Sequence, residues 1–208
     1  MPLWGTTHDS ATNKPKFLTT DEDSDYTRAD SYATQAGWVM QAGLASSGND
    51  NTSANPEVLV AIGGLAGTSS TTGLKTPTPT SMRFITGTTA ATDLTAGSSS
   101  QTILVEVTWD EAVTVAGSPT LAIANGNQGS GSGRGPYTCV YTATGSTANR
   151  KRFILASQTI AEDDVLTIGG ANIALAGGTI SDTVVGGTTL AAVLVLSGLT
   201  AVTHTVLA

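Results

Sequence analysis

Few residues of this chain are of the types that carry out acid–base, nucleophilic or metal chemistry. It has two histidines, His8 and His204, and one cysteine, Cys139. A zinc site needs several Cys, His or carboxylate ligands, and a catalytic triad needs a histidine that a carboxylate orients beside a serine. The histidines lie near opposite ends of the chain, without Cys, Asp or Glu at metal-binding spacing. We therefore expect no catalytic residue, no metal and no cofactor, and we expect that the protein is not an enzyme.

The cysteine itself lies in a pattern that favours packing over reactivity. Cys139 alternates with Tyr137 and Tyr141, so in a strand all three side chains point to one face. A free cysteine on an apolar face usually behaves as a small hydrophobic residue. We predict that Cys139 is a core residue.

Acidic residues give two incomplete candidates for a calcium site. Asp21, Asp23 and Asp25 have the 1, 3, 5 spacing of a calcium loop, but tyrosines occupy the sixth and twelfth positions, where Gly and Glu are expected. A second group that could supply oxygen ligands lies in later turns: Asp163, Asp164 and Asp182. We interpret the first group as a solvated acidic turn and the second as ordinary turn chemistry.

A glycine-rich segment, GSGSGRG at 129–135, resembles a phosphate-binding loop only in composition. It lacks the Gly-Lys-Ser/Thr ending, and the segment after it alternates like a strand, whereas a phosphate loop leads into a helix. We interpret it as a flexible hairpin tip.

The overall composition favours strands and argues against charged partners. Only 12% of the 208 residues are charged, and 24 are Gly, so long helices are not expected. The net charge is −7, and the nine Lys and Arg form no basic stripe, which argues against nucleic acid and anionic membranes. No apolar run approaches the ~20 residues of a membrane span, and the first residues lack the apolar core of a signal peptide. The single cysteine fits assembly in a reducing cytoplasm.

The elements that would position these groups begin with the clearest alternation in the chain, residues 102–123. Four apolar side chains fall on one face, and the polar and mixed residues between them fall on the other, which predicts a half-buried strand. The first face consists of Ile103, Val105, Val107 and Trp109, and the second of Leu104, Glu106, Thr108 and Asp110.

Short strand signals separated by Gly-, Ser- or Asn-bearing turns continue to the end of the chain, which is typical of a β-sandwich or barrel. The predicted strands are 82–86, 102–109, 113–115, 120–124, 137–143, 152–157, 165–168, 173–175, 192–196 and 202–207.

The N-terminal part has a different pattern. Residues 1–65 hold most of the net negative charge and show little periodicity, so we predict an extended, mostly irregular arm with a short helix near 27–36 and a strand at 57–62. Residues 66–80 are rich in Thr, Ser and Pro and are predicted to be a linker. Residues 81–208 form the predicted sandwich domain.

Residues 103–183 resemble an immunoglobulin-like domain found in large bacterial and phage surface proteins. The matching pieces are VEVTWDEAVTVAGSPTLAI, PYTCVYTATGS, KRFILASQTIAEDDVLTI and IALAGGTISD, with GNQGSGSGRG as an insertion. The resemblance implies an immunoglobulin-like β-sandwich. It implies no particular function, because such domains serve as scaffolds.

Residues 1–67 are similar to small structural proteins of tailed marine bacteriophages, including those that infect cyanobacteria. The matching pieces are MPLWG, a Lys-Pro-Lys segment, AGWV and EVLVAIGGLAG. The resemblance implies a virion protein made in the host cytoplasm, and a decoration protein on the outer capsid surface is the first choice. Its expected partners are the major capsid protein and other copies of itself, for instance as a trimer.

In this interpretation the N-terminal arm attaches to the capsid, and the sandwich domain faces outward from it. The residues expected to contact the capsid or another partner are Trp4, Lys14, Lys16, Phe17, Arg28 and Trp38. Two alternatives stay open: the arm folds back on the sandwich, or the protein is a receptor- or carbohydrate-binding module. The loops 125–135, 144–150 and 186–189 contain no aromatic residue, which argues against sugar stacking.

Overall fold

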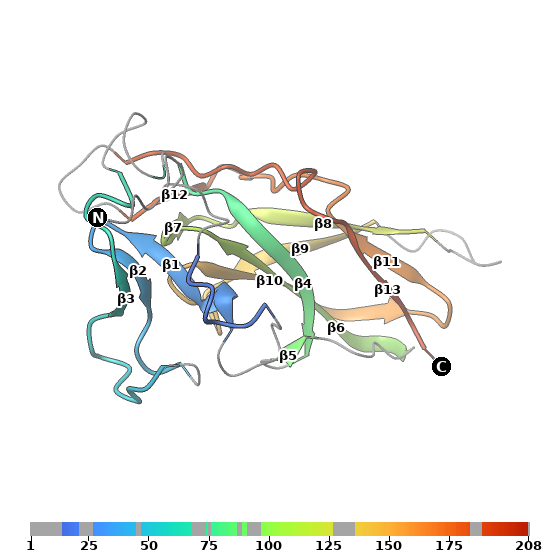
Figure 1. The fold of residues 1–208 in the computed structure, drawn as a ribbon. Helices are drawn as coiled ribbons and strands as arrows, with labels where there is room; N and C mark the ends of the chain where they lie inside the picture. The colour runs from blue at the N-terminus through green and yellow to red at the C-terminus, as the bar shows by residue number, and fades with distance from the viewer. Residues whose placement is uncertain are drawn as a thin grey trace.

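The computed structural model describes residues 14–20, 27–44, 47–67, 74, 76–86, 89–90, 97–126, 136–183 and 189–207. Its regular structure is almost entirely β, in antiparallel sheets that form a sandwich or near-barrel (Figure 1). The prediction of an all-β protein is therefore confirmed. The narrower immunoglobulin-like assignment stays a prediction.

A three-stranded antiparallel sheet forms within the segment that was predicted to be an irregular arm. Its strands are β1 (Ser31–Thr34), β2 (Gly37–Met40) and β3 (Glu57–Ala61), in that order across the sheet. Gly37 enables the β1–β2 turn, because its φ is +132° and a Cβ there would collide with the Val60 carbonyl oxygen. Only the strand at 57–62 was expected.

The predicted helix near 27–36 is wrong. Thr27 does cap a helical turn, but this is a 3-10 turn of three residues, η2 (Arg28–Asp30). The chain then enters β1, which pairs with β2 from Ser31 opposite Met40 to Thr34 opposite Gly37. Pairing with an apolar neighbouring strand outweighs the weak helix signal, since tertiary contacts routinely override propensity.

The larger sheet has eight strands in the order β13-β11-β8-β9-β10-β6-β4-β5, and β12 pairs with β7 in a separate two-stranded sheet. The strands are β4 (Pro79–Thr86), β5 (Thr89–Ala90), β6 (Gly97–Trp109), β7 (Val113–Ala116), β8 (Thr120–Asn125), β9 (Tyr137–Thr142), β10 (Arg150–Ile160), β11 (Val165–Ile168), β12 (Thr179–Asp182) and β13 (Val202–Thr205). The Phe84 ring on β4 lies 6.1 Å from the His204 ring on β13, so the sheet curls until these strands meet (Figure 1).

The main core lies inside this curled sheet, and the alternation at 102–123 predicted its centre. Ile103, Val105, Val107 and Trp109 are fully buried, and Cys139 is buried among them as expected. Burial raises the pKa of the Cys139 thiol to about 12, as expected for an unreactive packing residue.

Two predicted strands, 173–175 and 192–196, are not regular strands, and β12 was not predicted. The first segment bridges to β8 only at Thr120 and Ala174, while Ile173 bonds to Leu194. These two segments are anchored instead by buried side chains, including Ile173 and Leu196. Alternation of side chains shows which residues face the core, but it does not show whether a neighbouring strand is present to complete the ladder.

The second face of β6, which a half-buried strand would leave open to solvent, is buried toward the C-terminal end of the strand. Glu106, Thr108 and Asp110 are 1%, 1% and 3% exposed. The N-terminal segment lies against this end of the sandwich, where the backbone amide of Ala33 donates to the Asp110 carbonyl at 2.8 Å. In the part of the chain that is described, the segment thus folds back on the sandwich.

No helix among the described residues is long and apolar enough to cross a membrane.

Candidate functional site

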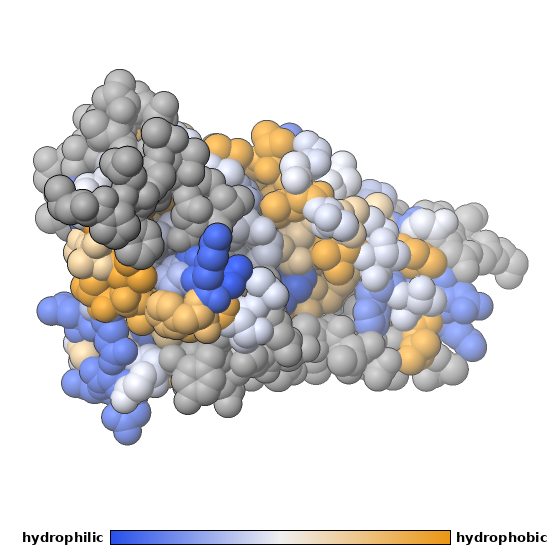
Figure 2. Space-filling view, in the orientation of Figure 1, coloured by the Kyte–Doolittle hydropathy of each residue, from blue (hydrophilic) through white to orange (hydrophobic). Residues whose placement is uncertain are grey.

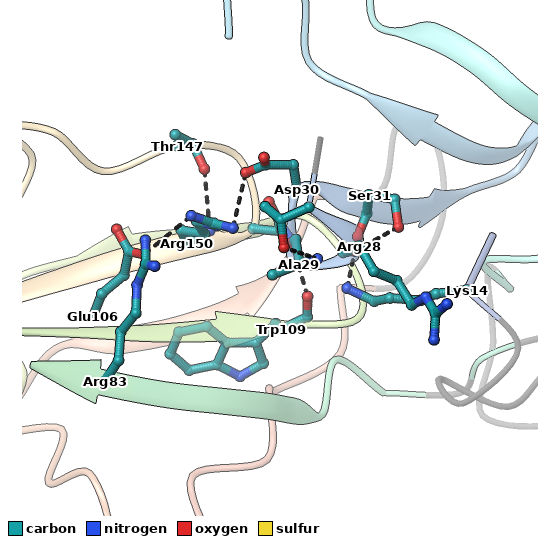
Figure 3. Close-up of polar contacts among 12 residues, drawn as sticks. Lys14, Arg28, Ala29, Asp30, Ser31, Arg83, Glu106, Trp109, Thr147 and Arg150 are labelled. Atoms are coloured by element: carbon teal, nitrogen blue, oxygen red, sulfur yellow. Dashed lines mark hydrogen bonds and ion pairs between the residues drawn. The ribbon is translucent and has the colours of Figure 1, made fainter. Parts of the chain in front are cut away.

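The N-terminal segment meets the sandwich along a polar contact between η2, β1 and strands β6 and β10, which we call the seam (Figure 3). At its centre is the carboxylate of Glu106. Arg83 on β4 donates to Glu106 Oε1 from Nη2 at 3.0 Å and from Nε at 3.2 Å. Arg150 Nη1 reaches the same oxygen at 3.4 Å, and Arg152 Nε donates to Oε2 at 3.1 Å.

This cluster exists because three neighbouring strands present their second faces to one point. Glu106 lies opposite Arg83 on β4 and opposite Arg152 on β10 in the sheet register. Cross-strand neighbours of opposite charge attract, and charge-assisted bonds stabilise a buried carboxylate. Glu106 is thus a structural residue that keeps three arginines in place.

Arg150 extends the cluster to the N-terminal segment. Its Nη2 lies 2.9 Å from Asp30 Oδ1 at the end of η2, an ion pair by distance whose angle is not that of a hydrogen bond. Asn149 adds a second link, donating from Nδ2 to the carbonyls of Ala29 at 3.0 Å and Trp109 at 3.2 Å. Side chains of the sandwich therefore bind the backbone and the side chains of the N-terminal segment directly.

A pocket of about 350 Å³ lies beside the seam, between the β1–β2 turn and the chain before β7 and after β12. Small and acidic residues dominate its wall: Ala33, Ala36, Ala66, Ala112, Glu111 and Asp182. Its size is within the range of small-molecule sites in proteins.

The carboxyl group of Glu111 is unusual in this wall. Glu111 is 3% exposed, and its Oε1 has no hydrogen-bond partner among the described residues. Burial, and to a smaller extent the negative charges of Asp110 and Asp182, together raise its pKa to about 8. At neutral pH the side chain is therefore mostly protonated.

The two neighbouring carboxylates are better satisfied. Burial raises the pKa of Asp110 to about 6, while the Thr78 amide and the Lys14 ammonium oppose the shift. Asp182 Oδ1 accepts a hydrogen bond from the Leu190 amide at 2.8 Å. Of these three carboxyl groups, Glu111 is thus the one with a buried oxygen that accepts no hydrogen bond from the described residues.

Of the six residues predicted to contact a partner, the five that the structure describes do not share one exposed surface. Trp4 lies outside the described residues. Lys16 is exposed, and Phe17 is 69% exposed, which leaves both available. Trp38 is 1% exposed and packs against Leu65 in a small second core, so the expectation that a partner covers it is wrong.

The other two basic residues hold the N-terminal segment together. Lys14 is buried, and its Nζ donates to the Ser31 carbonyl at 2.6 Å. Arg28 donates to the carbonyls of Pro15, Lys16 and Leu18 at 2.9 to 3.2 Å, which fixes the preceding loop. The structure therefore gives Lys14 and Arg28 internal roles.

One edge of the N-terminal sheet is open. β3 pairs with β2, and among the described residues no strand pairs with its other side. Val58 on this strand is 52% exposed, and Figure 2 shows hydrophobic surface at the end of the molecule that carries β3. Open strand edges with apolar side chains are common sites of pairing with another chain.

Several motifs that the sequence analysis considered lie outside the described residues: His8, the group Asp21, Asp23 and Asp25, and the segment 129–135. Of the second acidic group, Asp164 accepts a hydrogen bond from the Ala161 amide at 2.8 Å, as expected for turn chemistry. The described residues contain no group of three or more His, Cys, Asp or Glu side chains that could hold a metal ion.

Sequence reasoning missed Glu106 and Glu111 as important residues. A signal was present, because Glu106 interrupts an otherwise apolar and β-branched strand, and Asp110-Glu111 directly follows it. Recognising their burial needed knowledge that the N-terminal segment covers this face.

Comparison of the chain with protein-family models, with curated proteins and with solved structures finds no match.

Proposed function

We propose that this protein is a structural protein of a bacteriophage virion, most simply a head decoration protein that binds the major capsid protein and other copies of itself. The sequence likeness of residues 1–67 to phage structural proteins and of residues 103–183 to phage immunoglobulin-like domains motivates the proposal. The open, apolar edge of β3 is the observation that carries it, because it is a surface suited to assembly.

The attachment surface differs from the one that the sequence suggested. Trp38, Lys14 and Arg28 are engaged inside the fold. We assign attachment to the β3 edge, with Val58 at its centre, and treat exposed Phe17 and Lys16 as further contacts. An added strand from the capsid would bond to the free backbone groups of β3.

The seam gives this surface a rigid support. Ion pairs and hydrogen bonds join the N-terminal sheet to the sandwich, so a capsid-bound β3 would hold the whole molecule in one orientation. Many copies on a symmetric lattice gain avidity, even if each contact is weak. The bound copies would then stabilise the capsid against opening.

The test uses phage heads assembled without this protein, mixed with the full-length chain and sedimented. Val58→Lys places a charge on the proposed edge and should reduce the bound fraction at least about tenfold, since a charged edge strand resists pairing. Val195→Lys is the matched control, because Val195 is 48% exposed on the sandwich side and lies outside the named strands. It should bind like the wild type.

Head stability provides the second measurement. Heads that carry the wild-type protein should release DNA at a higher temperature than bare heads or heads mixed with Val58→Lys. Equal binding by both variants would contradict attachment through β3. Binding of the full chain to host cells or polysaccharide, and not to heads, would favour the receptor- or carbohydrate-binding alternative.

A further inference from the structure

The pocket between the N-terminal sheet and the sandwich has no role in the proposed attachment through β3. It is lined by residues from both units: Ala33 and Ala36 near the β1–β2 turn, and Glu111 and Asp182 on the sandwich. Among the described residues, its wall combines alanine methyl groups and carboxyl groups with the neutral side chains of Thr34, Gln35 and Thr183, and it includes no basic residue. This combination fits a ligand that is aliphatic along its length and cationic at its end.

We propose that this pocket binds the side chain of a lysine from a partner protein, with the ammonium at Glu111 and Asp182 and the methylene stem along the alanines. The stem of a lysine commonly lies along apolar surface while its charge is kept at a polar group. The four alanines of the wall, at 33, 36, 66 and 112, supply that apolar surface.

The state of Glu111 supports a cationic ligand. Its Oε1 is buried without a hydrogen-bond donor among the described residues, which costs folding free energy. An ammonium group would supply the missing donor and offset the repulsion from Asp110 and Asp182, the two acidic groups that act on Glu111. The nearby cation Lys14 acts on Asp110 and donates to the Ser31 carbonyl.

An ammonium fits better than the alternatives. Calcium takes about six to eight oxygen ligands, and the described residues offer no group of three His, Cys, Asp or Glu side chains that could hold a metal ion. The pocket is lined by two carboxyl groups that belong to separate segments of the chain. That arrangement suits the three donors of a compact ammonium better than the flat fork of a guanidinium.

The inference is tested on the full-length protein without capsids, so it can fail or succeed independently of the virion role. The probe is n-butylammonium, which has the stem and head of lysine, and n-butanol is its uncharged control. Alanine-methyl NMR should show saturable shifts at Ala33, Ala36, Ala66 and Ala112 with n-butylammonium, and at least about tenfold weaker binding of n-butanol.

Binding should also depend on pH. A proton must leave Glu111 before the ammonium replaces it, so the affinity should rise about tenfold per pH unit from about pH 6 to about pH 8. Glu111→Gln retains the shape of the protonated side chain and should lose the pH dependence and most of the affinity. Glu162→Gln, at an exposed glutamate in another turn, should change neither.

A second variant tests whether the ligand occupies the pocket, without changing any charged residue. Ala36→Leu, at an exposed turn residue in the wall, should fill part of the pocket and weaken n-butylammonium binding. The proposal is overturned if n-butylammonium shifts none of the alanine methyls, if n-butanol binds equally well, or if folded Glu111→Gln binds like the wild type.

Discussion

Single buried charges decide how the two parts of this chain fit together. Glu106 is 1% exposed and accepts hydrogen bonds from three arginines, so its buried negative charge is balanced by these side chains. Burying charges is costly, and the attraction between them balances that cost only in good geometry. Removing one partner of a buried ion pair therefore lowers the free energy of unfolding by more than the intact pair contributes to it.

Glu106→Gln should destabilise the protein strongly. The neutral amide removes the carboxylate that Arg83, Arg150 and Arg152 share in a buried site, and we expect a loss of about 3–5 kcal/mol in the free energy of unfolding. Urea denaturation followed by circular dichroism measures it. Glu162→Gln on the surface is the control and should stay within about 0.5 kcal/mol of the wild type. A loss below about 1 kcal/mol for Glu106→Gln would contradict the structural role of the cluster.

Glu111 should make stability depend on pH in the opposite sense to an ordinary acidic residue. Its pKa is about 8 in the folded protein against 4.5 for an unperturbed Glu, so the folded state binds the proton more tightly than the unfolded state. Its contribution to stability is therefore present below about pH 4.5 and is lost as the pH rises to about 8.

Glu111→Gln should remove this loss, because the amide cannot ionise. We expect the variant to exceed the wild type by about 4 kcal/mol in the free energy of unfolding at about pH 8, and to match it near pH 4.5. Thermal unfolding across this pH range measures the difference. Lys151, whose pKa burial lowers to about 8, acts mainly above that range and is common to both proteins. Parallel curves for the two proteins would show that Glu111 is not the group responsible.

At the scale of elements, the three-stranded sheet of β1, β2 and β3 depends on the sandwich for its position. Its own core is small, with Trp38, Leu65 and Leu74 as its largest buried members. A sheet this small needs an apolar face that is covered, or packing against another element, for stability. The backbone bond from Ala33 to Asp110 and the side chain of Asn149 supply that contact.

Asn149→Ala should loosen the N-terminal sheet selectively. The change removes hydrogen bonds to Ala29 and Trp109, and we expect a loss of about 1–2 kcal/mol that appears as faster amide exchange in β1 and β2. Amides in β9 and in the part of β10 away from the seam should exchange as before. Asn172→Ala, at an exposed residue distant in sequence from the seam, is the matched control. Uniformly faster exchange in all strands would show that the two parts unfold as one unit.

At the scale of the whole molecule, the N-terminal segment completes the sandwich. It lies against the end of the second face of β6, where Ala33 bonds to Asp110 and Asp30 pairs with Arg150 of the Glu106 cluster. The chain thus behaves as a small N-terminal sheet joined to a sandwich along one charged seam, whereas the sequence suggested a sandwich with an attached arm.

Deleting residues 1–75 tests this view directly. We expect the remaining chain to form the curled sheet, because its core is contained in β4 to β13, but with a Tm lower by about 10 °C. Exposure of the Glu106 cluster should also make its stability sensitive to salt, since exposed charges are screened. A shortened chain as stable as the full protein would restore the interpretation of the segment as an independent arm.

The sequence by itself determined the all-β class, most strands after residue 80 and the buried face of β6. It could do so because alternation along one strand is a local pattern, which assigned Ile103 to Trp109 and Cys139 to the core correctly. The burial of Trp38 and Glu106, the fold of the N-terminal sheet and the pocket at Glu111 were decided only by the tertiary structure. Each depends on contacts between segments far apart in the chain, such as Asn149 with Ala29 and Ala33 with Asp110, which no local pattern encodes.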